Sequence, residues 1–212
     1  MDIPVYDTAT EKNQVAATST SWSHTCSGTD RILIVSALMG INLTGLSITY
    51  NGVAMTQFAT EQTNGKKMAT YYLVNPSSGI NTISASWTTS QATRWIGYSA
   101  TGVNSGTPLG TPVTSAGSGT APNVDIGSNT DELGVGFAGV GGTTSVTFTA
   151  GTGDNLRIQA PPGANNGFMA CLDTTGTSPT VNIRANTNAS VTWEIIGVSL
   201  KPVSPSNFFM FF

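Results

Sequence analysis

The feature that most constrains the fold is an uninterrupted apolar run, Ile32-Leu33-Ile34-Val35, which has the length of a strand and is rich in β-branched side chains. A run of this kind is typical of a central strand that is covered on both faces. Further along, Asn51-Gly52 separates two apolar segments, residues 46–50 and 53–55. This dipeptide indicates a type I′ turn, because both central residues of that turn need a positive φ. The core is therefore predicted to begin as an antiparallel sheet.

The rest of the chain favours strands over helices. In residues 82–88, Ile83, Ala85 and Trp87 alternate with Ser and Thr, which predicts one buried and one exposed face. No window combines a helical period with capping residues. Further strands are predicted at residues 19–26, 68–74, 94–100, 132–140, 145–149, 156–159, 168–172, 181–185 and 191–200. We therefore predict an all-β, antiparallel β-sandwich, jelly-roll-like in its number of strands, with little or no helix.

The length of the chain favours a single domain, because 212 residues suit one large sandwich. We expect residues 1–13 to form an N-terminal arm, residues 14–201 the β-sandwich domain and residues 202–212 a C-terminal apolar tail. Residues 102–122 are rich in Gly, Ser, Thr and Pro, and they are predicted to be a long connection across one end of the sandwich.

Charged residues are scarce, at 9% of the chain against roughly 25% in average soluble domains. The surface is therefore expected to consist mainly of Thr, Ser, Asn and Gly. The net charge is −3 and the eight Lys and Arg residues are scattered, with only Lys66 and Lys67 adjacent, which argues against nucleic-acid binding. Residues 1–7 lack the apolar core of a signal peptide. No window approaches about 18 consecutive apolar residues, so no membrane-spanning helix is expected.

No residue pattern predicts catalysis. His24 is the only histidine, and it alternates with Trp22 and Cys26, which favours a histidine on a strand face over a general base. His24 and the two cysteines match no spacing of a zinc site, and no acidic cluster is dense enough for Ca²⁺. No pair of carboxylates stands out for glycoside hydrolysis. We therefore expect no enzymatic activity, no cofactor and no metal.

Two further features, the cysteines and Trp95, leave alternatives open. Cys26 and Cys171 are either two buried free thiols or the partners of a disulfide that would close a long loop. Trp95 is the best candidate for stacking on a glycan, and the alternative is burial in the core.

The most unusual feature is the apolar tail, whose large side chains are Phe208, Phe209, Met210, Phe211 and Phe212. Exposure of all five would create an apolar patch of a kind that soluble monomers avoid. The tail is therefore expected either to pack on its own domain or to bind a neighbouring subunit or the particle that carries it.

Several segments together resemble a widespread group of uncharacterised β-sandwich domains found in phage structural proteins and in bacterial cell-surface proteins. The similarity covers roughly residues 14–201 and consists of turns and core strands in matching order: residues 23–28 with 31–35, 48–56, 72–76, 98–103 with 107–110, and 196–200. No catalytic residues come with it. The resemblance implies a place on the exterior of a virion or cell.

Our first hypothesis is a non-enzymatic structural protein of a phage-like particle: a capsid decoration, head-fibre or tail-associated subunit that is homo-oligomeric and contacts other virion proteins. The alternative is a carbohydrate-binding or adhesion module of a phage or bacterial surface, with host glycans as its partners in host attachment. A hydrolase is a weaker third hypothesis, because no acid–base pair is evident.

Overall fold

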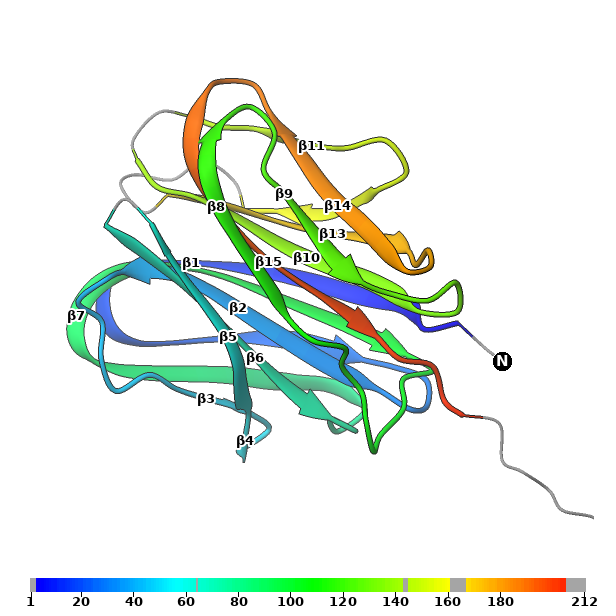
Figure 1. Ribbon diagram of the computed structural model, residues 1–212. Coiled ribbons are helices and arrows are strands. Elements are labelled where there is room, and N and C mark those ends of the chain that lie inside the picture. The colour runs from blue at the N-terminus through cyan, green and yellow to red at the C-terminus, as the bar shows by residue number, and fades with distance from the viewer. Residues whose placement is uncertain (1–2, 64, 143–144, 161–166, 205–212) are drawn as a thin grey trace, which may run out of the picture.

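The computed structural model describes residues 3–63, 65–142, 145–160 and 167–204. These residues form antiparallel strands and their connections, and none of them lies in a helix (Figure 1). The predicted all-β, antiparallel sandwich with little or no helix is therefore confirmed.

The first half of the chain forms one sheet in the order β4-β3-β7-β2-β6-β5, with β1 paired along the other edge of β7. Its strands are β1 (Val5–Cys26), β2 (Ile32–Gly40), β3 (Ser47–Tyr50), β4 (Val53–Ala54), β5 (Thr56–Thr63), β6 (Lys66–Val74) and β7 (Gly79–Thr101).

The second half forms a five-stranded sheet, β12-β13-β10-β15-β8, and a three-stranded sheet, β11-β14-β9. The strands are β8 (Val113–Gly119), β9 (Asn123–Gly127), β10 (Leu133–Val140), β11 (Phe148–Ala150), β12 (Asn155–Gln159), β13 (Phe168–Thr175), β14 (Thr180–Thr187) and β15 (Val191–Leu200).

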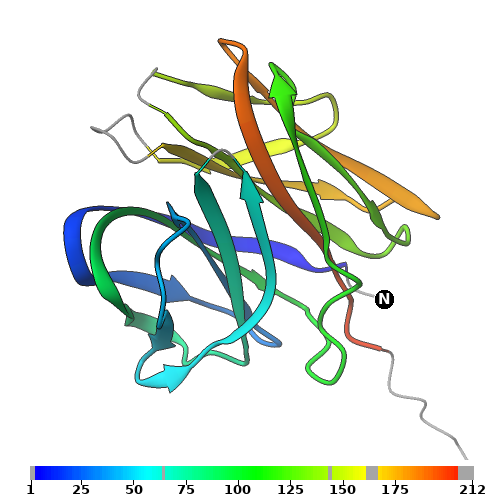
Figure 2. The same cartoon turned by 60° about the vertical axis from the view of Figure 1, so that its left-hand side comes forward.

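The long strands β1 and β7 bend together, so that one sheet contributes two layers (Figures 1 and 2). The register of their pairing shifts within residues 14–19 of β1, at the bend, and once more between Tyr6 and Thr8 near the start of the strand. On one side of the bend β7 pairs with β2, and on the other side it pairs with β3. Irregular pairing of this kind allows a sheet to turn sharply without losing its ladder elsewhere.

The result is a stack of four layers. The first contains β3, β4 and the halves of β1 and β7 nearest to β3; the second contains β2, β5, β6 and the other halves. The five-stranded sheet is the third layer and the three-stranded sheet is the fourth (Figure 1).

Three hydrophobic cores separate these layers. The first core lies between the first and second layers, the second core between the second and third, and the third core between the third and fourth. Ile32 and Ile34 of β2 belong to the second core, whereas Leu33 and Val35 belong to the first. All four side chains are fully buried, which confirms the predicted strand with two covered faces. Each such side chain contributes roughly 1.5–3 kcal/mol to stability.

Two segments differ from the sequence-based expectation. The predicted arm, residues 1–13, is not separate from the sandwich, because from Val5 onward the chain pairs with β7. The predicted connection, residues 102–122, contains strand β8, which pairs with β15 at the edge of the third layer. Strand β8 escaped detection because its exposed and half-buried residues alternate with few large apolar side chains.

The predicted Asn51-Gly52 turn is present, with φ values of 48° and 78°, and Tyr50 pairs with Val53 across it. A Cβ atom at Gly52 would contact nothing within 4 Å. The requirement for glycine is therefore conformational rather than steric.

We expect Gly52→Val to lower the free energy of unfolding by at least about 1–2 kcal/mol, because a β-branched residue resists a positive φ. Chemical denaturation with a spectroscopic readout measures this change. Gly127→Val is the matched control, since Gly127 has equally open surroundings and no positive φ. Equal effects of the two substitutions would contradict the assigned turn.

Candidate functional site

The outer face of the first layer carries two rows of hydroxyl groups. Ser86 of β7 pairs with Ser47 of β3 on one side and with Ser19 of β1 on the other. In the neighbouring row, Ser84 pairs with Thr49 and Ser21 in the same way. Strand alternation, which buries Ile83 and Ala85 beneath this face, places all six hydroxyls on the same side.

These rows line a groove of about 620 Å³, which we call the hydroxyl groove. Its other lining residues are Lys12 and Gln14, from the half of β1 in the second layer, and Thr20 and Ala85. The six hydroxyls of the rows make no hydrogen bond to another residue that the structure describes. They can therefore both donate to and accept from a ligand.

The composition of the hydroxyl groove suits binding rather than catalysis. Its lining contains one ammonium group, one amide and seven hydroxyls, with no carboxylate, imidazole or thiol. Adjacent hydroxyls in a row are separated by the strand spacing, roughly 4.7–4.9 Å. Such a surface is complementary to a neutral ligand with many hydroxyl groups.

His24 lies in the first core, with only 1% of its surface exposed. Its Nδ1 is 2.8 Å from Thr10 Oγ1, which also accepts a 3.1 Å hydrogen bond from Trp22 Nε1. Burial lowers the pKa of His24 to about 4, although Asp7 acts in the opposite direction. The imidazole is therefore neutral near pH 7 and fixed between core side chains, as expected for a histidine on a strand face.

Cys26 and Cys171 are both buried and are free thiols. Cys26 lies in the first core and Cys171 in the second, on opposite faces of the second layer. The disulfide alternative is therefore wrong, and the alternative of two buried thiols is correct.

Trp95 is completely buried, so the hypothesis that it stacks on a glycan is wrong. Its ring centroid lies 5.8 Å from that of Trp22 and 5.7 Å from that of Trp87. Its Nε1 donates a 2.7 Å hydrogen bond to Thr93 Oγ1. The ring is part of an aromatic cluster in the first core and offers no free face to a ligand. The predicted interface residues Phe208–Phe212 lie outside the described residues.

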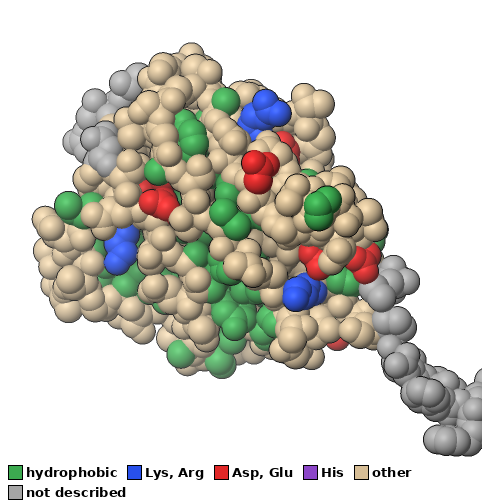
Figure 3. All heavy atoms as spheres, in the orientation of Figure 1, with side chains coloured by type: hydrophobic (Ala, Val, Ile, Leu, Met, Phe, Trp, Pro, Cys, Tyr) green, Lys and Arg blue, Asp and Glu red, His purple; other side chains and the backbone are tan. Residues whose placement is uncertain are grey.

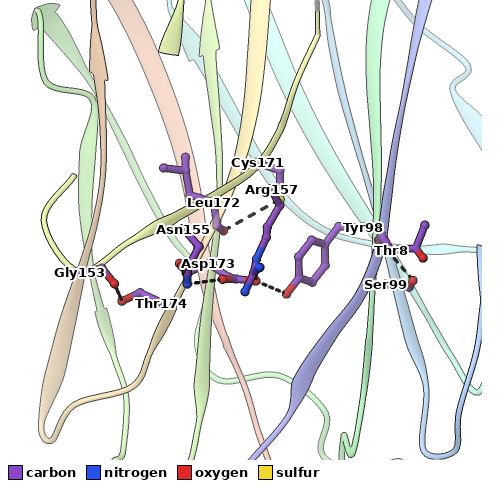
Figure 4. A network of polar contacts seen from close by, with 10 residues as sticks. All are labelled: Thr8, Tyr98, Ser99, Gly153, Asn155, Arg157, Cys171, Leu172, Asp173 and Thr174. Atoms are coloured by element: carbon purple, nitrogen blue, oxygen red, sulfur yellow. Dashed lines mark hydrogen bonds and ion pairs between the residues drawn. The ribbon is translucent and has the colours of Figure 1, made fainter. Parts of the chain in front are cut away.

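A buried polar network joins the second and third layers, and it was not predicted from the sequence (Figure 4). Asp173 Oδ2 accepts hydrogen bonds from the Tyr98 hydroxyl at 2.9 Å and from Arg157 Nε at 2.7 Å. Asn155 Nδ2 donates to Oδ1 at 3.1 Å, and the Arg157 guanidinium lies 4.4 Å from the Tyr6 ring centroid. The only sign of it in the sequence was an acid directly after the predicted strand 168–172.

This network has the properties of a structural link. Asp173 is fully buried and both of its oxygens accept hydrogen bonds from protein side chains, so the carboxylate is out of reach of a ligand. Burial raises the pKa of Tyr98 well above its ordinary value, and the neighbouring carboxylate adds to the effect. Tyr98 therefore keeps its proton and holds β7 against β13.

The part of the chain that the structure describes contains neither a metal-binding cluster of side chains nor a membrane-spanning helix. In that part, no group of three or more His, Cys, Asp or Glu side chains is arranged to hold a metal ion. Nor do these residues include a helix of the length and hydrophobicity needed to cross a bilayer.

One buried carboxyl group is expected to affect stability. Glu194 of β15 lies between the second and third layers with 1% of its surface exposed. Its pKa is raised from 4.5 to about 8, mainly by burial and to a smaller extent by Glu61, although the Thr63 backbone and Lys66 act in the opposite direction. The folded protein therefore keeps a proton on Glu194 under conditions in which the unfolded chain releases it.

It follows that wild-type stability decreases as the pH rises through the window from 4.5 to about 8. Glu194→Gln removes this contribution, so the variant should gain stability relative to the wild type across that window, by an amount on the order of a few kcal/mol. Denaturant titrations at both ends of the window test the expectation. Asp125→Asn, at an exposed carboxylate, controls for the loss of one charge. Parallel pH profiles for wild type and Glu194→Gln would contradict the assignment.

Comparison with known proteins gives no relative for this chain: no protein-family model, no curated protein and no solved structure matches it. Functional inference therefore depends on the hydroxyl groove, on the buried ionisable groups and on the character of the surface.

Proposed function

We propose that the chain is a non-enzymatic structural subunit on the exterior of a phage-like particle, as a capsid decoration, head-fibre or tail-associated protein. The observation that carries this proposal is the placement of the ionisable groups. His24, Asp173 and Glu194, which could in principle move protons, are all buried between layers. The hydroxyl groove instead presents hydroxyl groups.

The surface supports the same proposal. Figure 3 shows few charged side chains on a face made up mainly of uncharged side chains and backbone. A surface of this kind has no strong field to attract nucleic acid. The resemblance of the turn and core-strand segments to domains of phage structural and bacterial cell-surface proteins points in the same direction.

The surroundings of Val203, near the last residue that the structure describes, are consistent with contact to another subunit. The backbone N–H of Val203 donates a 3.1 Å hydrogen bond to Gly102, and Gly102 in turn lies against Ile3 and Pro4. Ile3, Val5 and Val203 are 40%, 60% and 39% exposed. Exposed apolar side chains therefore surround the point from which the apolar tail continues, which favours burial of this region on assembly.

Deletion of residues 207–212 should leave the melting temperature nearly unchanged but reduce oligomerisation or attachment to the particle. The reason is that the tail follows the last core strand, whereas its five large apolar side chains offer substantial docking energy. Light scattering after size-exclusion chromatography and co-sedimentation with particles measure the two effects.

A double variant, Phe209→Ser with Phe211→Ser, keeps the length of the tail and isolates the contribution of its apolar side chains. If the truncated chain assembles and attaches like the full chain, the tail is not an interface. If the truncated chain unfolds, the tail belongs to its own domain. Immunogold labelling of intact particles tests the exterior location, and labelling that requires disrupted particles would contradict it.

A second candidate function, glycan binding for host attachment, is favoured by the hydroxyl groove. Thr49→Val removes one hydroxyl with almost no change in shape, and it should weaken binding to a responsive neutral glycan by about two- to tenfold, because a lost hydrogen bond costs roughly 0.5–1.5 kcal/mol. Thr114→Val, on exposed β8, is the matched control. A glycan array that gives no signal, or a signal equally reduced by both variants, would count against this function.

A further inference from the structure

A second cavity, of about 350 Å³, opens at the edge of the first core, between the loop that precedes β3 and strands β2, β5 and β6. It is separate from the hydroxyl groove, and no lining residue is common to both. The apolar part of its lining is formed by Met39, Leu43, Leu46, Ala69 and the ring of Tyr71. These side chains belong to the first core or pack against it. The cavity therefore opens into the first core and is not merely a depression of the surface.

Strand alternation explains how polar groups come to border this apolar cavity. Lys67, Ala69 and Tyr71 occupy alternate positions of β6, so they lie along one face, and Gln57 of β5 pairs with Tyr71. The Tyr71 hydroxyl donates a 2.7 Å hydrogen bond to Gln57 Oε1. This bond orients the amide and leaves the Gln57 Nε2 hydrogens as donors. The polar border therefore presents donors above an apolar interior.

Lys67 supplies the only charge in the lining. Its side chain is half-buried, and it forms no ion pair with another residue among those the structure describes. A half-buried ammonium without a carboxylate partner, next to an amide donor, is complementary to an anionic acceptor. No acidic side chain lines the cavity to compete for it.

We propose that this cavity binds a small amphipathic carboxylate. The aliphatic or aryl-alkyl body of the ligand occupies the space between Leu43, Leu46 and Ala69, and its carboxylate accepts hydrogen bonds from Lys67 Nζ and Gln57 Nε2. The volume is close to the lower end of the range for small-molecule sites, roughly 300–1,000 Å³, so the ligand is small. The apolar side chains of the lining disfavour a polyhydroxylated ligand, and Lys67 disfavours a cation. This proposal is independent of the function proposed above.

The probe for the test is 3-phenylpropionate, and its neutral analogue 3-phenylpropionamide has the same apolar body. Titration of isotope-labelled protein, followed by amide NMR shifts, should give saturable changes at Leu43, Gly45 and Ala69. The amide should bind at least tenfold more weakly, because it cannot form the ion pair with Lys67. This comparison uses the unaltered protein and therefore does not depend on whether a variant folds.

Substitution identifies the cation. Lys67→Gln should weaken binding of the carboxylate at least tenfold and remove its advantage over the amide. Lys201→Gln, at a half-buried lysine that lines neither cavity, is the matched control and should leave binding unchanged. Absence of saturable shifts at these positions, equal affinity for acid and amide, or full affinity in Lys67→Gln would overturn the proposal. It would also be overturned if these signals shifted with protein concentration alone, because the occupant would then be a second copy of the chain.

Discussion

The constraint on which the structure depends is the burial of single strands on both faces. Strand β2 is covered by the first core on one side and the second on the other, and β10 separates the second and third cores in the same way. Such strands cannot provide a surface, so each needs a layer above and a layer below it. Two doubly covered strands in neighbouring sheets therefore require four layers. In the first half of the chain, the extra layer arises from the bend in β1 and β7 rather than from another sheet.

Close packing in the third core depends on glycine at one crossing point. Gly136 of β10 pairs with Gly197 of β15. A Cβ atom at Gly136 would lie 2.7 Å from Ile183 Cγ2, and one at Gly197 would lie 2.6 Å from Val124 Cγ1. Both distances are too short for any side chain, so the fourth layer can approach the third only because this pair has none. The glycines of β10 therefore serve close packing. They are not a phosphate-binding loop, because such a loop lies between a strand and a helix.

The fold was predictable from the sequence where the signal is local. The run from Ile32 to Val35, the Asn51-Gly52 turn and the alternation around Ile83 each identified their structure correctly, because burial and turn geometry act over a few residues. Strand β8 was missed because its small side chains give no hydrophobic period. The continuity of β1 and β7 through their shared bend was also not apparent, since each reads as separate short strands.

The hydroxyl groove and the buried network both depend on pairings between distant segments, which is why neither was predicted. The hydroxyl groove requires the register that places Ser84 between Thr49 and Ser21, and the buried network requires Tyr98 to meet Asp173 across two sheets. Local sequence suggested that residues such as Ser84 face water, but it contained no information on which strands would lie beside them. For Trp95 it left both alternatives open, and only the positions of Trp22 and Trp87 decide that the ring is covered.

The two cavities differ in their lining although they adjoin at one point in the chain. Leu46 lines the apolar cavity, and the next residue, Ser47, lines the hydroxyl groove. Strand β3 begins at Ser47, at the edge of the first layer. The side chain of Leu46, just before the strand, therefore points toward the first core, and that of Ser47 points toward solvent. Strand alternation then keeps Ile48 in the core and Thr49 in the groove. A thin layer of this kind can present polar and apolar binding surfaces side by side without breaking its backbone hydrogen bonds, because adjacent residues of one strand belong to opposite faces.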